Sequence, residues 1–343
     1  MPDQSPPHRD RPIFVVGCPR SGTTLLQLML HSHPRIAIPP ETRIIVHAYH
    51  RRRSFGDLRR ADNRAALARW VTRPRRQFGD LGLDTEEFIH RAIYAPGSLG
   101  SVIGTVFQMY AERHGKPRWG DKRPPYVRYI DVLVRLFPNA QIIHLVRDPR
   151  DCVASLKEMP WFVGGTPEAI QRWSEAIDFG RRAAQNLPAD TYYELRYEDL
   201  TADPARELAA LCGFLGERYD DAMCEPERIA DVVPAHKTWH RNVRREVTAS
   251  RVRSWPERLE PWEIGLCEVA LGDRLEAHGY EPSGAPRPSR SQLRAYRKAC
   301  AAARRKLRFE DFRDRIDRLR EPCPVADPLI DTTIARDTAA HMT

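Results

Sequence analysis

The chain has 343 residues, of which 41% are hydrophobic and 29% are charged, a composition typical of a globular protein with a substantial core. No apolar run approaches the roughly 18 residues of a membrane-spanning helix, and the polar N-terminus lacks the apolar stretch of a signal peptide, so we expect a cytoplasmic protein. The seven cysteines are scattered without a C-x-x-C pair, which argues against a disulfide framework or a zinc site.

The first predicted elements enclose a phosphate-binding loop that has lost its lysine. Residues 12–16 form a short apolar strand, residues 24–30 open a helix, and Gly-Cys-Pro-Arg-Ser-Gly-Thr-Thr lies between them. The spacing is that of the loop G-x-x-x-x-G-K-[ST], but Thr23 replaces the lysine that reaches the β- and γ-phosphates of ATP. Backbone amides at a helix N-terminus bind anions whatever the side chains are. We therefore expect this loop to hold an anion other than the ATP tail.

Strands and helices alternate along the rest of the chain. We predict, in chain order, helices within 64–114, a break at 119–125, a helix near 127–136, a buried strand at 141–146, a helix from Pro149, a strand at 191–197, and helices near 204–215 and 261–278. This order predicts an α/β fold: a P-loop-type, mostly parallel sheet with helices on both faces, plus a C-terminal helical extension. Ligands bind such sheets at strand-to-helix turns.

The net charge of +9 is concentrated near the C-terminus. Residues 287–320 contain 13 lysines and arginines against four acidic residues, whereas bases and acids balance in the remaining chain. We expect one globular domain over 11–282, a linker over 283–289, a basic amphipathic helix over 290–320 and a loose tail over 321–343. An apolar stripe in the helix, formed by Leu293, Tyr296, Cys300, Ala303 and Leu307, predicts packing on the domain or pairing in a homodimer. Contact with a membrane surface is the weaker alternative, and no nucleic acid is expected.

Three segments, in the same order along the chain, resemble motifs of PAPS-dependent sulfotransferases (PAPS is 3′-phosphoadenosine 5′-phosphosulfate). Residues 19–24, Pro-Arg-Ser-Gly-Thr-Thr, resemble the loop that binds the 5′-phosphosulfate. Residues 145–155 resemble the motif in which an arginine and a serine eight residues later clamp the 3′-phosphate. Residues 40–45, Pro-Glu-Thr-Arg-Ile-Ile, resemble a segment of the tyrosylprotein sulfotransferase branch. The resemblance covers roughly 11–282 and implies a sulfotransferase catalytic domain.

The resemblance also implies which residues bind PAPS. The residues that match cofactor-binding positions are Arg20, Ser21, Gly22, Thr23, Thr24, Arg147, Ser155 and Tyr197, with Arg245 the best candidate in the basic loop 237–255. Arginine suits bidentate phosphate binding. A helix cap at Ser21 and Thr23, and a strand-end ion pair at Arg147, are the structural alternatives. Met159 stands where tyrosylprotein relatives have a further arginine, which weakens the assignment to that branch but leaves the cofactor unchanged.

For catalysis, the resemblance implies Glu41 as the general base and Arg20 and Lys122 as the groups that stabilise the leaving phosphate. His31 and His33 are rival bases, because other sulfotransferases use a histidine. Side chains can neutralise the leaving group, so no metal is required. Arg43 resembles an acceptor-contacting arginine, and His47 replaces a second one. The arginines between 51 and 60 are either a solvated helix face or a surface that attracts an acidic acceptor.

The expected function is transfer of a sulfuryl group from PAPS to an acceptor hydroxyl, with PAP as product. The acceptor stays open among sugar, lipid, small metabolite and peptide. The alternative is a P-loop nucleotide kinase or NTPase, which would need a lysine at position 23.

Overall fold

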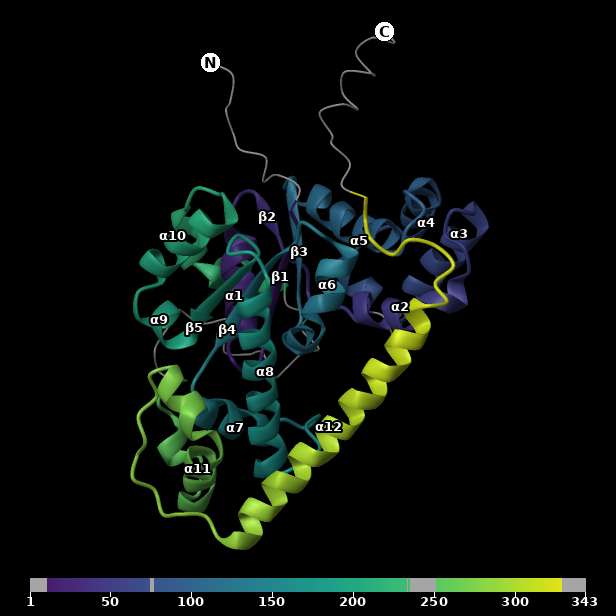
Figure 1. Ribbon diagram of the computed structural model, residues 1–343. Helices are drawn as coiled ribbons and strands as arrows, with labels where there is room; N and C mark the ends of the chain where they lie inside the picture. The colour runs from purple at the N-terminus through teal and green to yellow at the C-terminus, as the bar shows by residue number, and fades with distance from the viewer. Residues whose placement is uncertain (1–10, 75–76, 233, 235–250, 329–343) are drawn as a thin grey trace.

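The computed structural model describes residues 11–74, 77–232, 234 and 251–328. At its centre is a five-stranded sheet with the strand order β2-β3-β1-β4-β5, in which every pair of neighbours is parallel (Figure 1). The strands are β1 (Ile13–Gly17), β2 (Ile36–Ala37), β3 (Arg118–Lys122), β4 (Gln141–Val146) and β5 (Tyr192–Arg196). The predicted parallel α/β sheet is confirmed.

Helices cover both faces of the sheet. Since side chains alternate along a strand, the central strand β1 packs against both layers. Phe14 and Val16 of β1 join a core cluster with α5 (Leu99–Arg113), α6 (Ile130–Leu136), α7 (Pro149–Lys157) and α8 (Thr166–Asn186). Ile13 and Val15 point to the other face and pack with α1 (Thr23–Ser32) and α10 (Pro204–Leu215). The central strand β1 is therefore buried on both sides, and the loop that follows it has a fixed base.

The remaining helices extend this framework. They are α2 (Ile45–Arg51), α3 (Ala61–Val71), α4 (Thr85–Tyr94), α9 (Tyr197–Ala202), α11 (Pro261–Ala277) and α12 (Arg290–Arg318). Among the residues described, no helix is both long and apolar enough to cross a membrane.

One predicted break is a strand. Residues 119–125 were expected to interrupt the chain, but Arg118–Lys122 form β3, which pairs with β1 and β2. The strand carries Arg118, Asp121 and Lys122, so it has no apolar alternation from which it could be recognised. All five of its residues are buried, and its charged groups are stabilised by specific partners rather than by solvent.

Helix α12 crosses the outside of the domain from the α11 end to the α2 end (Figure 1). None of its residues is fully buried, but Leu293 and Tyr296 pack against the core. Near the other end of the helix, Asp314 accepts a hydrogen bond from Arg52 at 2.8 Å. The apolar stripe of this helix therefore packs on its own domain.

The segment after α12 is not the loose tail predicted for 321–343, as far as it is described. Val325 is 6% exposed and belongs to the core, and its carbonyl accepts a hydrogen bond from the Gly100 amide at 2.8 Å. Asp327 accepts a hydrogen bond from the Ser101 hydroxyl at 2.6 Å. A short extended segment has no periodicity, so the sequence alone did not indicate this docking. Residues 329–343 lie outside the described residues.

Candidate active site

The loop after β1 makes a sharp turn in which two residues have positive φ angles. Gly22, the N-cap of α1, has φ 97° and Arg20 has φ 76°. A Cβ atom on Gly22 would lie 2.4 Å from the Tyr197 ring, so only glycine fits between this ring and the helix. Glycine also has no side chain with which to cap α1. The loop thus presents a helix N-terminus, which attracts anions.

Arginines from two motifs meet at the tips of β1 and β4, which are adjacent parallel strands. Arg20 Nε donates to Ser155 Oγ at 2.9 Å, and Arg147 Nη1 donates to the Arg20 carbonyl at 3.2 Å. Burial, together with the charge of Arg147, lowers the pKa of the Arg20 guanidinium. The buried Arg147 Nε has no hydrogen-bond partner among the described residues. A buried guanidinium group with an unsatisfied donor, next to a half-buried one, fits a phosphate group.

Tyr197 forms a wall of the same site. It follows β5, is 7% exposed, and lies with its ring centre 4.4 Å from the guanidinium carbon of Arg147. The ring therefore contacts both the Gly22 turn and Arg147. This position fits a ligand that bears an aromatic base next to a phosphate.

Lys122 and Glu41 lie on the other side of the loop. Lys122 Nζ, at the end of β3, donates to Thr24 Oγ1 at 3.1 Å and to Glu41 Oε1 at 2.5 Å. The Lys122 side chain is 1% exposed, whereas that of Glu41 is 29% exposed. A buried cation therefore faces the first turn of α1, and its carboxylate partner is accessible from solvent.

The sequence did not identify Asp121 as a residue of interest. It is 0% exposed, and it accepts hydrogen bonds from the Tyr126 hydroxyl and the Lys122 amide, both at 2.9 Å. Burial raises its pKa to about 7, with a smaller contribution from the nearby Glu41 charge. No pattern in the sequence distinguishes this carboxyl group, because its environment is created by strand pairing.

Asp151 pairs with Arg147, which was the structural alternative for that arginine: its Oδ2 lies 3.6 Å from Arg147 Nη2. It accepts from the Arg253 amide at 3.0 Å and from Ser254 Oγ at 2.9 Å, and Arg147 Nη2 donates to the Arg251 carbonyl at 2.5 Å. These contacts fix the chain that returns from the predicted basic loop. The spacing of four residues between Arg147 and Asp151 was the signal in the sequence that the two side chains could meet. Arg245, the predicted residue of that loop, lies outside the described residues.

The rival histidines bind backbone groups away from the loop. His31 Nδ1 accepts from the Ile38 amide at 3.1 Å, and His33 Nε2 lies 2.8 Å from the Arg218 carbonyl. Burial lowers the pKa of His31 to about 3. Both residues are buried at the C-terminal end of α1, opposite the end that begins at the loop. This geometry favours Glu41 over either histidine as a base.

The acceptor side is less closely assembled. Arg43 is exposed, on the same segment as Glu41, and His47 lies half-buried in α2. The arginines that follow do not form a free basic patch. Arg52 is paired with Asp314 and Glu321, Arg53 with Asp317, and Arg59 with Asp57. Two of these arginines attach α12 to the domain, so the prediction that this run attracts an acidic acceptor loses its main support.

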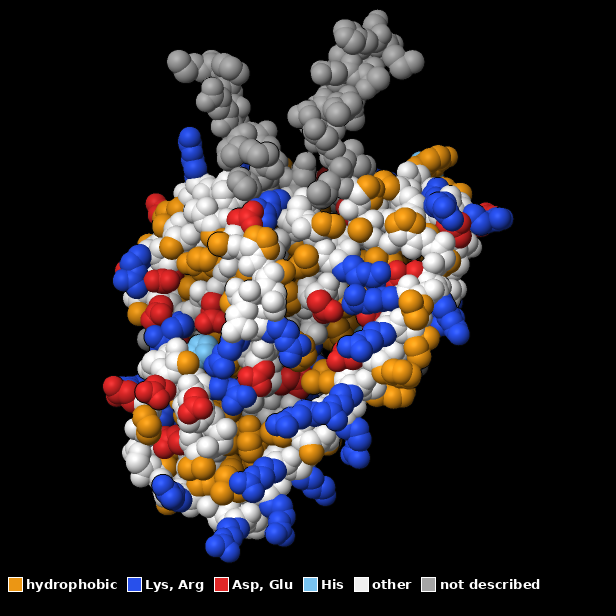
Figure 2. Space-filling model, viewed as in Figure 1, with side chains coloured by type: hydrophobic (Ala, Val, Ile, Leu, Met, Phe, Trp, Pro, Cys, Tyr) orange, Lys and Arg blue, Asp and Glu red, His pale blue; other side chains and the backbone are white. Residues whose placement is uncertain are grey.

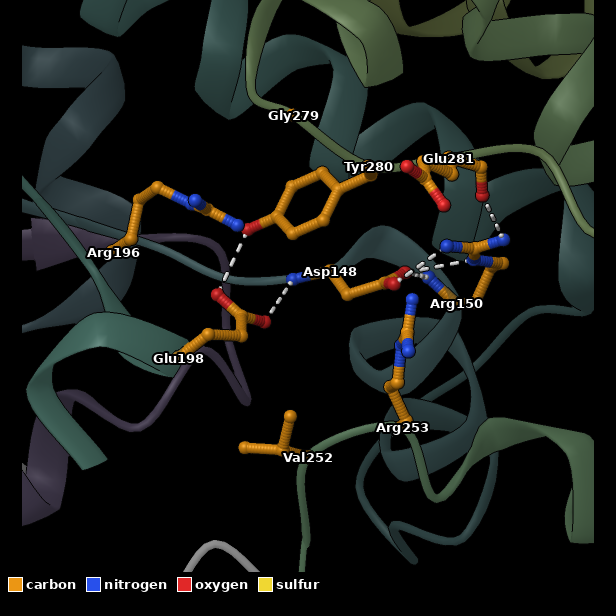
Figure 3. Close-up of a pocket in the computed structure, with 9 residues that line it drawn as sticks. All are labelled: Asp148, Arg150, Arg196, Glu198, Val252, Arg253, Gly279, Tyr280 and Glu281. Carbon is orange, nitrogen blue, oxygen red and sulfur yellow. Dashed lines mark hydrogen bonds and ion pairs between the residues drawn. The ribbon is translucent and has the colours of Figure 1, made fainter. Parts of the chain in front are cut away.

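A pocket of about 310 Å³ lies beside the turns that follow β4 and β5 (Figure 3). In Figure 3 the Tyr280 hydroxyl lies between Arg196 and Glu198, and Arg253 points toward the Asp148–Arg150 ion pair. Asp148 and Arg150 form an ion pair in its wall, and none of the predicted cofactor residues lines it. Its lining residues are Asp148, Arg150, Arg196, Glu198, Val252, Arg253, Gly279, Tyr280 and Glu281.

A metal centre is not indicated by the described ranges, since no group of three or more His, Cys, Asp or Glu residues there is placed to hold a metal ion.

Comparison with known proteins gives a consistent set of relatives. A family model described as "Sulfotransferase family" matches residues 12–221. Protein-tyrosine sulfotransferase of Drosophila melanogaster is 24% identical over 294 residues, which cover 81% of this chain and 54% of the fly protein. Protein-tyrosine sulfotransferase 1 of Danio rerio is 26% identical over 295 residues, which cover 81% of this chain and 75% of the fish protein. This chain thus spans about half the length of the fly relative.

Two solved structures share the fold. The sulfotransferase domain from the curacin biosynthetic pathway has a TM-score of 0.58 at 22% identity, covering 79% of this chain and 98% of that domain. The sulfotransferase domain from the Synechococcus PCC 7002 olefin synthase has a TM-score of 0.54 at 24% identity, covering 81% of this chain and 98% of that domain. At these identities, the similarity shows the fold alone.

Proposed function

Because this chain belongs to the sulfotransferase family, we propose that it transfers a sulfuryl group from PAPS to an acceptor hydroxyl. The single observation that supports this most strongly is the contact between Arg20, Ser155 and Arg147. It joins the two motifs that would bind opposite ends of a nucleotide bisphosphate, although they are far apart in the sequence.

The residues present fit PAPS. Gly22 and Arg20, with the N-terminus of α1, would hold its 5′ end, and Arg147 with Ser155 would hold its 3′-phosphate. Tyr197 would contact the nucleoside between them. PAPS supplies the sulfuryl group and the phosphate that leaves.

The chain's own groups then have separate tasks. Lys122 and Arg20 provide positive charge where negative charge develops, in a buried setting where such charge acts strongly. Glu41 accepts the proton of the acceptor hydroxyl, and its partial exposure leaves it open to that acceptor. The Lys122–Glu41 contact, at 2.5 Å, holds base and cation together before the acceptor arrives.

The same contacts disfavour a nucleotide kinase or NTPase. Thr24 occupies the position whose hydroxyl binds Mg²⁺ in those loops, and here that hydroxyl accepts a hydrogen bond from the Lys122 ammonium at 3.1 Å. A cationic side chain thus faces the position of the metal ion, and the loop lysine is absent.

The test combines binding and turnover. PAP binding is measured by calorimetry, and turnover by transfer of radiolabelled sulfate from PAPS into a fractionated lysate. We expect Arg147→Gln to weaken PAP binding about 30-fold, because a charged phosphate contact is lost. Glu41→Gln should retain PAP binding and lower turnover by about 100-fold or more. The exposed Arg69→Gln and Glu86→Gln serve as matched controls. Full turnover by Glu41→Gln would exclude it as the base, and absence of PAP binding by the wild type would overturn the proposal.

The acceptor class is addressed by a second set of reactions. Relatives are named protein-tyrosine sulfotransferases, so tyrosine-containing peptides form one arm, beside sugar, lipid and small phenol acceptors. Only a hydroxyl acceptor is proposed here. Labelling of an amine and of no hydroxyl compound would contradict it.

A further inference from the structure

Helix α12 has one face that its own domain leaves uncovered. Its inner face is occupied: Leu293 and Tyr296 pack against the core, and Glu310 and Asp314 accept hydrogen bonds from Arg128 at 3.1 Å and Arg52 at 2.8 Å. With 29 residues, the helix is about 43 Å long. Because it is held near both ends, its opposite face stays directed outward.

One side of the exposed surface of the helix is strongly basic. At 100° per residue, six exposed arginines fall on one side of the helix, and no ion pair within the described part of the chain involves any of them. Figure 2 shows Lys and Arg side chains in a row along this helix. We call this surface the α12 basic face; its arginines are Arg294, Arg297, Arg304, Arg305, Arg308 and Arg315.

Large hydrophobic side chains lie along the same face. Phe309 is 65% exposed, Phe312 is 62% exposed and Leu319, just past the helix end, is 87% exposed. Phe312 and Leu319 point in the direction of the arginines, and Phe309 lies at the margin of the face. Figure 2 shows hydrophobic side chains among the basic ones toward the α2 end.

This combination favours one type of partner. A second copy of the chain would bring two arginine rows together, and their like charges would repel. A nucleic-acid backbone would satisfy the arginines but would leave the two phenylalanines and the leucine in water. An anionic bilayer satisfies both groups, since its headgroups attract arginine and its acyl boundary accepts aromatic and aliphatic side chains.

We propose that the α12 basic face docks on an anionic phospholipid surface, with Phe309, Phe312 and Leu319 inserted at the headgroup boundary. The docking would bring α2 close to the membrane, because the Tyr49 hydroxyl donates to Asp314 at 3.3 Å. Since α2 follows the Glu41 segment directly, the acceptor side of the site would lie near the bilayer. The docking itself does not depend on the proposed sulfuryl transfer, but the placement of the acceptor side rests on it.

The test is co-sedimentation of the full chain with vesicles of phosphatidylcholine alone or containing about a third phosphatidylglycerol. We expect binding only to the anionic vesicles, weakened by salt. Each basic side chain near such a surface strengthens binding about fivefold, so the triple variant Arg304→Gln, Arg305→Gln, Arg308→Gln should bind roughly 100-fold more weakly. The double variant Phe309→Ser, Phe312→Ser should lose at least roughly tenfold. All five positions are exposed, and thermal melts check that the variants remain folded.

A matched triple variant separates a specific face from overall charge. Arg60→Gln, Arg69→Gln and Arg73→Gln remove the same charge from exposed positions around α3 and should leave vesicle binding within about twofold. Equal loss in both triple variants would overturn the proposal, as would absence of binding to anionic vesicles. If the phenylalanine variant bound like the wild type and a DNA duplex displaced the vesicles, the face would be a nucleic-acid site instead.

Discussion

Replacing Asp121 by asparagine should change how the stability of this protein depends on pH. The carboxyl group is 0% exposed, and burial raises its pKa from 3.8 to about 7. Between these two pH values, the folded protein holds a proton that the unfolded chain has released. The free energy of unfolding of the wild type therefore falls by about 1.4 kcal/mol per pH unit as the pH rises through this window. The complete loss is about 4 kcal/mol and is reached above about pH 7.

The asparagine variant stays neutral at every pH and keeps an oxygen that can accept from the Lys122 amide. Its stability relative to the wild type should therefore rise by about 2 kcal/mol between pH 5 and pH 7 and then level off. The assay is urea unfolding followed by tryptophan fluorescence at several pH values from 5 to 8. Only the difference between the two proteins is interpreted, because other titrating groups affect both.

A second variant tests the cause of the shift. The Tyr126 hydroxyl donates to Asp121 at 2.9 Å, a contact that favours the ionised carboxylate and lowers its pKa. Tyr126→Phe should therefore raise the pKa of Asp121 in the folded protein and move the upper end of the window to higher pH. A stability difference between wild type and Asp121→Asn that stays constant within about 0.5 kcal/mol from pH 5 to 8 would refute the reasoning.

Two further substitutions test contacts that position the site. Gly22→Ala places a Cβ 2.4 Å from the Tyr197 ring, at a residue with φ 97°. It should lower the free energy of unfolding by about 2 kcal/mol in urea and weaken PAP binding at least tenfold by calorimetry. The control Gly213→Ala, whose Cβ meets nothing within 4 Å, should change neither quantity. Glu321→Gln removes the charged partner of Arg52 and Arg135 and should lower the free energy of unfolding by about 2 kcal/mol. The control Glu276→Gln, at an exposed position, should change this free energy by less than about 0.5 kcal/mol. Equal losses in the two variants would show that the Glu321 contacts are not stabilising.

Several features of the candidate site can be predicted from short stretches of sequence. The loop between 17 and 24 has a fixed spacing of glycines between an apolar strand and a helix, and each of these signals is local. The strand that ends at Arg147 is a continuous apolar run, which is typical of a strand buried on both faces. From these, the parallel α/β sheet was predicted correctly, and the two loops that follow β1 and β4 lie at adjacent strand ends. The catalytic roles assigned through the family resemblance stay predictions until the variants are assayed.

Other features were decided by packing between distant segments. Strand β3 was not predicted because its charged residues give no alternation of apolar and polar positions. The docking of Val325 was not predicted because a short extended segment has no periodic pattern. The arginines after residue 50 looked like a solvated patch, yet two of them pair with acids more than 200 residues later.

Local sequence thus determined where the turns after β1 and β4 occur, since the backbone conformations they require depend on neighbouring residues. Tertiary structure decided which side chains meet there. Lys122 reaches Thr24 and Glu41 across 98 and 81 residues only because β3 lies next to β1 in the sheet. The high pKa of Asp121 has the same origin, because the free energy of a charged group depends on the surrounding dielectric and partners, and these exist only once the chain has folded.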